Sequence, residues 1–231
     1  MAAQNSGMTT RIGTRVAPRL GALAPELTAT FIREALARAI DGVGPMAGAE
    51  KVANDALAAH PTDEDRAVHH LIETHVRLAG GQGFLTNLGG IVTAPVTIPA
   101  NLAGLAVLQC RLIAAIAHLR GHDLGYARVR LAVLATLMGE ERVEEMLTSM
   151  KLPAPPLALA TAPAYDPELE RIVATTVAGD MVGALAGKRL VTTLGRRIPI
   201  VGGVVCAGTD GYGTWKIGRY AEREFLRRAR R

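Results

Sequence analysis

A long stretch without charge is the feature that most restricts how this chain can fold. From Leu78 to Cys110 the sequence contains no Asp, Glu, Lys, Arg or His. A membrane-spanning helix needs about 20 consecutive apolar residues, but Gly90, Pro95 and Pro99 interrupt this stretch. We therefore expect a helix–turn–helix that is buried in the protein core. Partial embedding of the same hairpin in a membrane is the alternative that the sequence leaves open.

The composition predicts an all-α fold. Apolar residues make up 49% of the 231 residues and aromatic residues only 3%, so aliphatic and small side chains must fill the core. The strict alternation of apolar and polar residues that marks a half-buried strand is scarce. A chain of this length suits one core. We predict a single-domain helical bundle over residues 25–231, preceded by a flexible tail over residues 1–24.

Apolar periodicity and helix-end signals predict where the helices lie. Thr62 is the expected N-cap of the third helix, because acidic residues follow it in the first turn. The proline-rich segment 152–164 is expected to be a non-helical linker inside the domain. The predicted helices cover residues 26–41, 45–60, 62–78, 101–120, 125–138, 140–150, 167–194 and 199 onward.

Small residues recur at intervals of four in the last two predicted helices. A glycine inside a helix costs about 1 kcal/mol, and close packing against a second backbone offsets that cost. We therefore predict a tightly packed, glycine-rich C-terminal helical hairpin. Its small residues are Gly179, Gly183 and Gly187 in the first helix, and Gly203, Ala207 and Gly211 in the second.

A pattern of glycines, prolines and polar residues runs through the chain from Glu73 onward. In this pattern the chain resembles the EcsC family of bacterial proteins. The resemblance implies an all-α protein, with suggested links to secretion and membrane processes, and it supplies no catalytic motif. The residues that carry it are Gly83, Leu88, Gly89, Gly90, Pro95, Pro99, Gln109, Ala114, Ala115, Ile116, Ala117, Gly121, Asp123, Gly187, Lys188, Pro199, Gly202, Gly203, Asp210 and Gly218.

Several polar residues interrupt the apolar helices, and buried charges are costly unless they are paired. The favoured interpretation is an internal salt-bridge network in which Arg111 or Lys188 meets Asp180 or Asp210. The alternative is a polar spot in an apolar cavity that holds a phosphate or carboxylate head. The ligand-binding candidates are then Gln109, Arg111, His118, Lys188 and Asp210.

Two groups of residues have a spacing that metal sites use. His118 and His122 lie four residues apart, and acidic residues and histidines crowd residues 63–75. We interpret the first as a polar helix end and the second as a solvated helix face, because both patterns are common without a metal. We predict no metal and no cofactor.

The sequence leaves open whether the chain is an enzyme. It contains no Walker lysine loop, no GxGxxG after a strand, no GxSxG and no DDxxD. An enzyme acting on an amphiphilic substrate, such as a prenyl or lipid phosphate, is the alternative function. The catalytic candidates are then Asp210, Lys188, His75 and Asp123.

The formal charge of +5 favours anionic partners. Arg219, Arg223 and Arg227 follow at intervals of four beside apolar residues, a pattern typical of a helix at a membrane surface. A solvated helix end is the alternative. Nucleic acid is not expected, because recognition motifs are absent and aromatic residues are few.

The leading functional hypothesis is a bundle that binds a lipid-like or other apolar small molecule. No apolar signal-peptide core follows the N-terminal arginines, so we expect a cytoplasmic protein, peripheral on the inner face of the membrane. A third hypothesis is an interaction protein that docks other proteins through the apolar hairpin. The ligand and the oligomeric state are not determined by the sequence.

Overall fold

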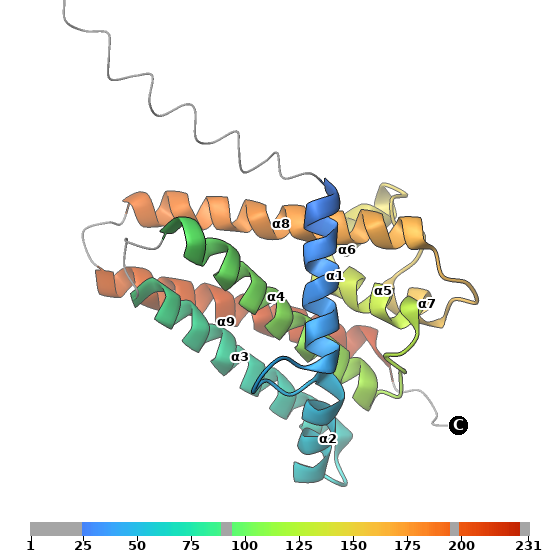
Figure 1. Ribbon diagram of the computed structural model, residues 1–231. Coiled ribbons are helices and arrows are strands. Elements are labelled where there is room, and N and C mark those ends of the chain that lie inside the picture. Colours follow the sequence, from blue (N-terminus) through green and yellow to red (C-terminus); the bar gives the residue numbers. More distant parts are fainter. Residues whose placement is uncertain (1–24, 89–93, 195–198, 227–231) are drawn as a thin grey trace, which may run out of the picture.

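The computed structural model describes residues 25–88, 94–194 and 199–226, with the side chains of 29–81, 102–181, 183, 184 and 208–226. These residues form nine α-helices and no β-strand, which confirms the all-α bundle (Figure 1). The tail expected over residues 1–24 lies outside the described residues. The helices are α1 (Pro25–Asp41), α2 (Ala49–Ala59), α3 (Glu64–Leu88), α4 (Ala94–Leu119), α5 (Ala127–Leu137), α6 (Glu140–Thr148), α7 (Pro156–Thr161), α8 (Pro167–Leu194) and α9 (Pro199–Glu224).

Helix α4 lies at the centre of the bundle, where α1, α2, α3, α5 and α9 pack around it. Every residue from Ala106 to Ala117 is buried. The window Leu102–Leu119 is long and apolar enough to cross a membrane, but 78% of it is buried inside the protein. A core helix covered on all sides is apolar all round. Burial of the uncharged stretch is thus confirmed for residues 106–110, but it is wrong for Leu78, which is 45% exposed. The side chains of 82–101 lie outside the described residues.

Helix α9 packs along α3. Gly211 lies against Val76 of α3, and a Cβ atom added to Gly218 would lie 2.9 Å from Cγ1 of Ile72. A side chain at residue 218 would hold the two backbones apart. The close approach that the glycines of α9 permit is therefore an approach to α3, and α3 runs antiparallel to α9 (Figure 1).

The tight packing predicted between α8 and α9 is wrong for the residues that the structure describes. A Cβ atom added to Gly179 or Gly183 would meet open space. Helix α8 instead packs against α1 and α5. The periodic spacing of glycines reveals a smooth face but not which helix covers it. The side-chain surroundings of Gly187, Gly203 and Ala207 lie outside what the structure describes.

Helix ends differ from the prediction at several places. Helix α3 continues to Leu88 rather than ending near Leu78, and its N-cap is Asp63 rather than Thr62, because Oδ1 of Asp63 accepts a hydrogen bond from the backbone N–H of Arg66 (2.9 Å). Two other helices start at different residues than expected. Helix α4 starts at residue 94, with a proline in its first turn, and α2 starts at residue 49.

The linker predicted over 152–164 contains a short helix. Helix α7 begins at Pro156, where a missing N–H costs nothing because the first turn has no partner for it. Leu159 and Ala160 are buried, and α7 packs against α5. The expectation that this segment cannot be helical is therefore wrong, and the segment belongs to the core.

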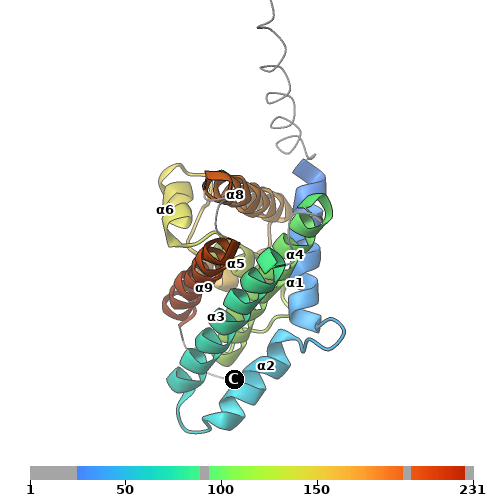
Figure 2. The ribbon, with the colours of Figure 1, turned by 90° about the vertical axis from the view of Figure 1, so that its left-hand side faces the viewer.

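The two ends of the bundle are built from different helix ends. The end of α3, the start of α4, the end of α8 and the start of α9 lie together, at the left in Figure 1 and toward the viewer in Figure 2. The start of α3 and the ends of α4 and α9 lie at the opposite end. This arrangement decides which of the predicted residues can act together.

Candidate functional site

A buried pair of side chains, His75 and Arg111, links α3 to α4. The side chain of Arg111 donates from Nε to Nε2 of His75 (3.1 Å) and from Nη1 to the carbonyl oxygen of Ala47 (3.3 Å). His75 in turn hydrogen-bonds through Nδ1 to the carbonyl oxygen of Leu71 (2.8 Å). Because a carbonyl only accepts, Nδ1 carries the proton and Nε2 is the acceptor for Arg111.

Burial controls the charge states of this pair. The pKa of His75 is lowered to about 4, and desolvation is the largest cause. The hydrogen bond to Leu71 raises this pKa, and the charge of Arg111 lowers it. Desolvation also lowers the pKa of Arg111. The guanidinium is therefore held by neutral acceptors, the imidazole of His75 and the carbonyl of Ala47. At neutral pH the pair carries one positive charge.

Three more buried polar residues lie where α9 meets α4. Nε2 of Gln109 donates to Oγ1 of Thr214 (3.3 Å), and Asp210 lies one turn earlier on α9. Together with His75 and Arg111, they are buried polar residues that interrupt the apolar core of the bundle. We call these five residues the polar layer.

The predicted salt-bridge network is wrong for Arg111 and Asp180, whereas a pairing of Lys188 with Asp210 stays a prediction. Arg111 forms no ion pair with another residue whose side chain is described. Asp180 lies at the surface, where Nε of Arg142 on α6 donates to its Oδ2 (3.1 Å). The side chain of Lys188 lies outside the described residues. Spacing along one helix identified the polar residues but not their partners, because the partners come from α3, α6 and α9.

Asp123 lies outside the polar layer that contains two of the other catalytic candidates, His75 and Asp210. Asp123 lies in the loop after α4, where its Oδ1 accepts a hydrogen bond from the backbone N–H of Gly125 (2.8 Å). This carboxylate lines an open hollow of about 750 Å³ beside the loop between α1 and α2. His75 is fully buried beside Arg111, and Arg111 lies eight residues before the end of α4. The placement of His75 and Asp123 therefore does not favour a shared catalytic site.

His118 and His122 do not share a ligand position. Gly121 adopts a positive φ of 83° and ends the helix between them, and the N–H of His122 bonds the carbonyl of Ala117 (3.0 Å). The ring of His122 is buried edge-on against Phe225 (centroids 5.3 Å apart), whereas His118 is half-buried. Among the side chains that the structure describes, no group of three His, Cys, Asp or Glu could hold a metal ion.

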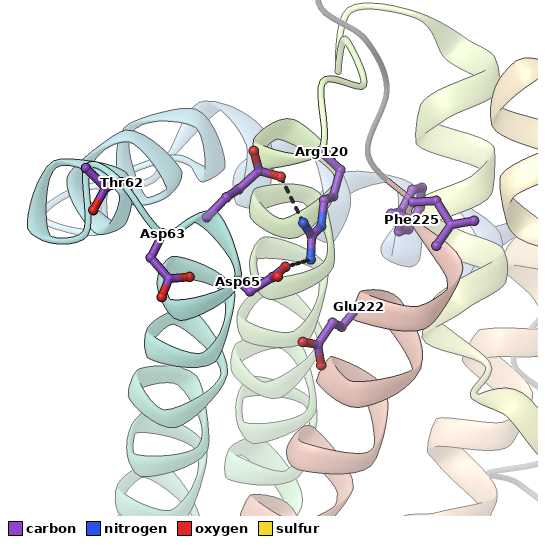
Figure 3. Close-up of a pocket in the computed structure, with 8 residues that line it drawn as sticks. Thr62, Asp63, Asp65, Arg120, Glu222 and Phe225 are labelled. Atoms are coloured by element: carbon purple, nitrogen blue, oxygen red, sulfur yellow. Dashed lines mark hydrogen bonds and ion pairs between the residues drawn. The ribbon is translucent and has the colours of Figure 1, made fainter.

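The acidic start of α3 surrounds a hollow of about 440 Å³ (Figure 3). Arg120, at the end of α4, donates to Glu64 (2.9 Å) and to Asp65 (2.7 Å) across it. On α9, Glu222 is paired with Arg219. We call the residues Glu64, Asp65, Arg120, Arg219 and Glu222 the charged end. Its carboxylates are compensated by arginines within the chain.

The two described arginines of the predicted membrane-contact set are paired inside the protein. Arg219 bonds Glu222 and Nε2 of His69 (3.0 Å), and Arg223 pairs with Glu140 of α6. Both guanidinium groups therefore already have polar partners, as in the alternative of a solvated helix end. The third member, Arg227, lies outside the described residues.

The opposite end of the bundle differs in composition. In sequence, its helix segments contain no Asp or Glu, and their only charged residues are Lys188 and Arg189. Two further arginines, at 196 and 197, follow α8 in the sequence. We call these segments the acid-free end: residues 82–88 of α3, 94–101 of α4, 185–194 of α8 and 199–207 of α9.

A stacked aromatic pair on α9 was missed by the sequence reasoning. Tyr212 and Trp215 are 63% and 46% exposed, and their rings stack with centroids 5.8 Å apart and planes at 19°. Their spacing of three residues was the available signal, because residues three apart share a helix face.

No family model, no curated protein and no solved structure matches the chain. The resemblance to the EcsC family therefore stays a prediction.

Proposed function

We propose that this chain is a peripheral membrane protein that binds lipid, with the acid-free end as its contact with an anionic bilayer. One observation carries the proposal. The uncharged stretch 78–110 and the stretch 181–209, which contains no Asp or Glu, belong to different hairpins, yet their helix ends lie at the same end of the bundle.

The physical argument rests on charge. A solvated helix end normally carries charges of both signs, as the charged end does with Arg120, Glu64 and Asp65. A bundle end with cations and no carboxylate suits a surface that is apolar in depth and negative at its headgroups. Each basic residue near such a surface contributes about 1 kcal/mol of binding free energy.

The proposed membrane contact is the acid-free end, and not the last turns of α9 that the sequence pattern had indicated. Arg219 and Arg223 have carboxylate partners within the chain, so they offer little free positive charge. Lys188 and Arg189 of α8 take their place as the cations that meet lipid headgroups. The suggested membrane links of the EcsC family, which the chain resembles, agree with this assignment.

Co-sedimentation of the full chain with vesicles tests the proposal. We expect the protein to pellet with phosphatidylcholine vesicles containing phosphatidylglycerol and to bind pure phosphatidylcholine vesicles weakly. The double variant Lys188→Glu with Arg189→Glu should bind the anionic vesicles at least ten-fold more weakly, because tenfold corresponds to about 1.4 kcal/mol. Raising the salt concentration should weaken the wild-type binding.

The matched control reverses two exposed cations elsewhere. Arg66 and Lys151 are exposed and lie outside the acid-free end, so Arg66→Glu with Lys151→Glu changes the net charge equally. This control should bind vesicles nearly as well as the wild type. Equal losses in the two double variants would reduce the effect to net charge, and no binding of the wild type to anionic vesicles would contradict the proposal.

A further inference from the structure

The exposed aromatic residues of this protein have different surroundings. Aromatics are scarce, with one Trp, four Tyr and three Phe. The hydroxyl of Tyr165 donates to Glu170, and the ring of Tyr126 lies under the guanidinium of Arg128, 4.2 Å from its centroid. Tyr212 and Trp215 instead stack on each other at the surface. Two large aromatic side chains exposed together are unusual in a chain with so few aromatic residues.

The pair lies on the outer face of α9, next to the acid-free end. The opposite face of the helix is buried against α3 and α4, through Gly211, Thr214 and Gly218. Tyr212 follows the last residue of the acid-free end by about one and a half turns, on the order of 8 Å along the helix. Lys216, the first charged residue of α9 on the exposed side, comes directly after the pair.

The sequence of α9 therefore changes in one direction. It begins without charge over residues 199–207 and continues, past the buried Asp210, with the two exposed rings. Lys216 and Arg219 follow, paired with Glu141 and Glu222. Tyr and Trp favour the level of lipid headgroups, because each has an apolar body and a polar group that hydrogen-bonds with water or headgroups. Apolar, then aromatic, then cationic is the order in which a membrane interface accommodates side chains.

A protein partner fits the pair less well. A buried aromatic side chain removes about 150–250 Å² from water, so two rings that are about half exposed offer on the order of 200 Å². A stable protein interface needs about 800 Å² from each partner. The residues flanking the pair, Gly208, Thr209 and Gly213, add little apolar surface. A bilayer needs no such area, and the attraction to an anionic one comes from Lys188 and Arg189 of the acid-free end rather than from the paired Lys216 and Arg219.

We propose that the Tyr212–Trp215 pair anchors α9 in the headgroup region of an anionic bilayer. This inference rests on the proposed function and names the side chains that make the contact. The pair supplies apolar contact and polar groups at the interface, while Lys188 and Arg189 supply the charge attraction.

Trp215 is the only tryptophan in the chain, so its own fluorescence reports the contact. We add vesicles of phosphatidylcholine and phosphatidylglycerol to the full chain and follow the emission maximum. We expect a blue shift of several nanometres, and quenching when the vesicles contain brominated phosphatidylcholine. If the protein co-sediments with the vesicles while the emission and quenching stay unchanged, this inference is wrong and the proposed function stands. If it does not co-sediment, both are wrong.

A variant series supplies the second measurement. Tyr212→Ser with Trp215→Ser should weaken binding to anionic vesicles at least ten-fold in co-sedimentation, whereas Trp215→Phe should keep most of it. Tyr126→Ser is the matched control, because Tyr126 is 50% exposed on another part of the surface, and it should bind like the wild type. Circular dichroism checks that each variant is folded.

A dimer offers the competing explanation. If the wild-type chain is dimeric by light scattering and the double variant is monomeric with unchanged vesicle binding, the pair belongs to a protein interface and the inference is overturned. A monomeric wild type with weakened vesicle binding in the double variant supports it.

Discussion

The two ends of the bundle differ in whether their basic residues have acidic neighbours. At the charged end, Arg120, directly after α4, bridges Glu64 and Asp65 of α3, and Arg219 pairs with Glu222. At the acid-free end, the sequence places Lys188 and Arg189 among segments without a carboxylate. Helices α3, α4 and α9 reach both ends, so the difference is not a property of any one helix.

The difference between the two ends indicates whether the partner of a basic residue lies within the chain or outside it. Cations with carboxylate partners in the chain stabilise the fold and leave little charge for a ligand. In the proposed function, cations without such partners in their own segment, Lys188 and Arg189, attract an external anion. The polar layer between the two ends follows a third rule, because the Arg111 cation is held by the neutral acceptors His75 and Ala47.

The largest expected effect concerns this middle region. The folded pKa of His75, about 4, lies below its ordinary value of 6.5, so between these values the unfolded chain binds more protons. Stability is then complete above pH 6.5 and falls as the pH is lowered toward 4, by up to about 3 kcal/mol for this group. Urea unfolding measured from pH 7 to pH 4 checks the slope.

His75→Gln isolates the contribution of this histidine. The variant removes the titrating group while keeping an acceptor for Arg111, so its stability should change less steeply across the same pH window. The comparison uses the slope and not the absolute stability, which the substitution also alters. Identical slopes for the variant and the wild type would show that His75 is not the group responsible.

The next largest effect tests the close packing of α9 against α3 and α4. Gly218→Val places a side chain where a Cβ atom already lies 2.9 Å from Ile72 and 3.1 Å from Cδ2 of Leu112. We expect a loss of about 2–3 kcal/mol in the free energy of unfolding, because α9 must move away from α3 and α4. Thermal unfolding gives the measurement, and an unchanged midpoint would refute the close packing of α9 on α3.

A smaller effect on stability is expected when an ion pair at the charged end is removed, and this substitution also tests whether that end binds vesicles. Arg120→Leu leaves Glu64 without its partner in a site where the arginine side chain is only 11% exposed. The expected cost is about 2 kcal/mol, between the values for exposed and for buried ion pairs. Vesicle binding should not change.

Arg223→Leu serves as the control for this substitution. Its pair with Glu140 is exposed, so its loss should change stability by about 0.5 kcal/mol or less. Chemical unfolding and vesicle co-sedimentation of both variants check the two expectations together. If Arg120→Leu abolished vesicle binding while remaining folded, the functional contrast between the two ends would fail.

The smallest expected effect is a gain in stability. Gly183 lies inside α8, and a Cβ atom there would meet no other atom. Gly183→Ala should therefore stabilise the protein by about 0.5–1 kcal/mol, because alanine restricts the unfolded chain and favours a helix. A decrease in the melting temperature would instead mean that this face of α8 packs against another backbone, as the glycine spacing had predicted.

Local features of the sequence predicted much of the helical framework. The apolar periodicity before Asp41 and after Pro167 indicated α1 and α8 almost to the residue, and Gly121 marked the end of α4. The least accurate boundaries lie in the uncharged stretch. There α3 continues to Leu88, because the absence of charge removes the contrast between faces on which periodicity depends.

The candidate site shows the same division. His75, Gln109, Arg111 and Asp210 were recognised from the sequence as polar residues in apolar surroundings, and all four are buried. Their partners were not recognised, because a hydrogen bond between α3 and α4 joins residues far apart in the sequence. Asp180 was assigned to the same network and lies at the surface with Arg142.

The sequence by itself determined that this chain is helical, that α4 is apolar enough to be its core, and which segments lack acidic residues. Each of these follows from neighbours within a few turns, where spacing and composition act directly. Only the tertiary structure decided that α9 packs on α3 and that helix ends without acidic residues from two separate hairpins lie together. Those outcomes depend on which smooth faces fit best in three dimensions, and several pairings of smooth helices satisfy the same local pattern.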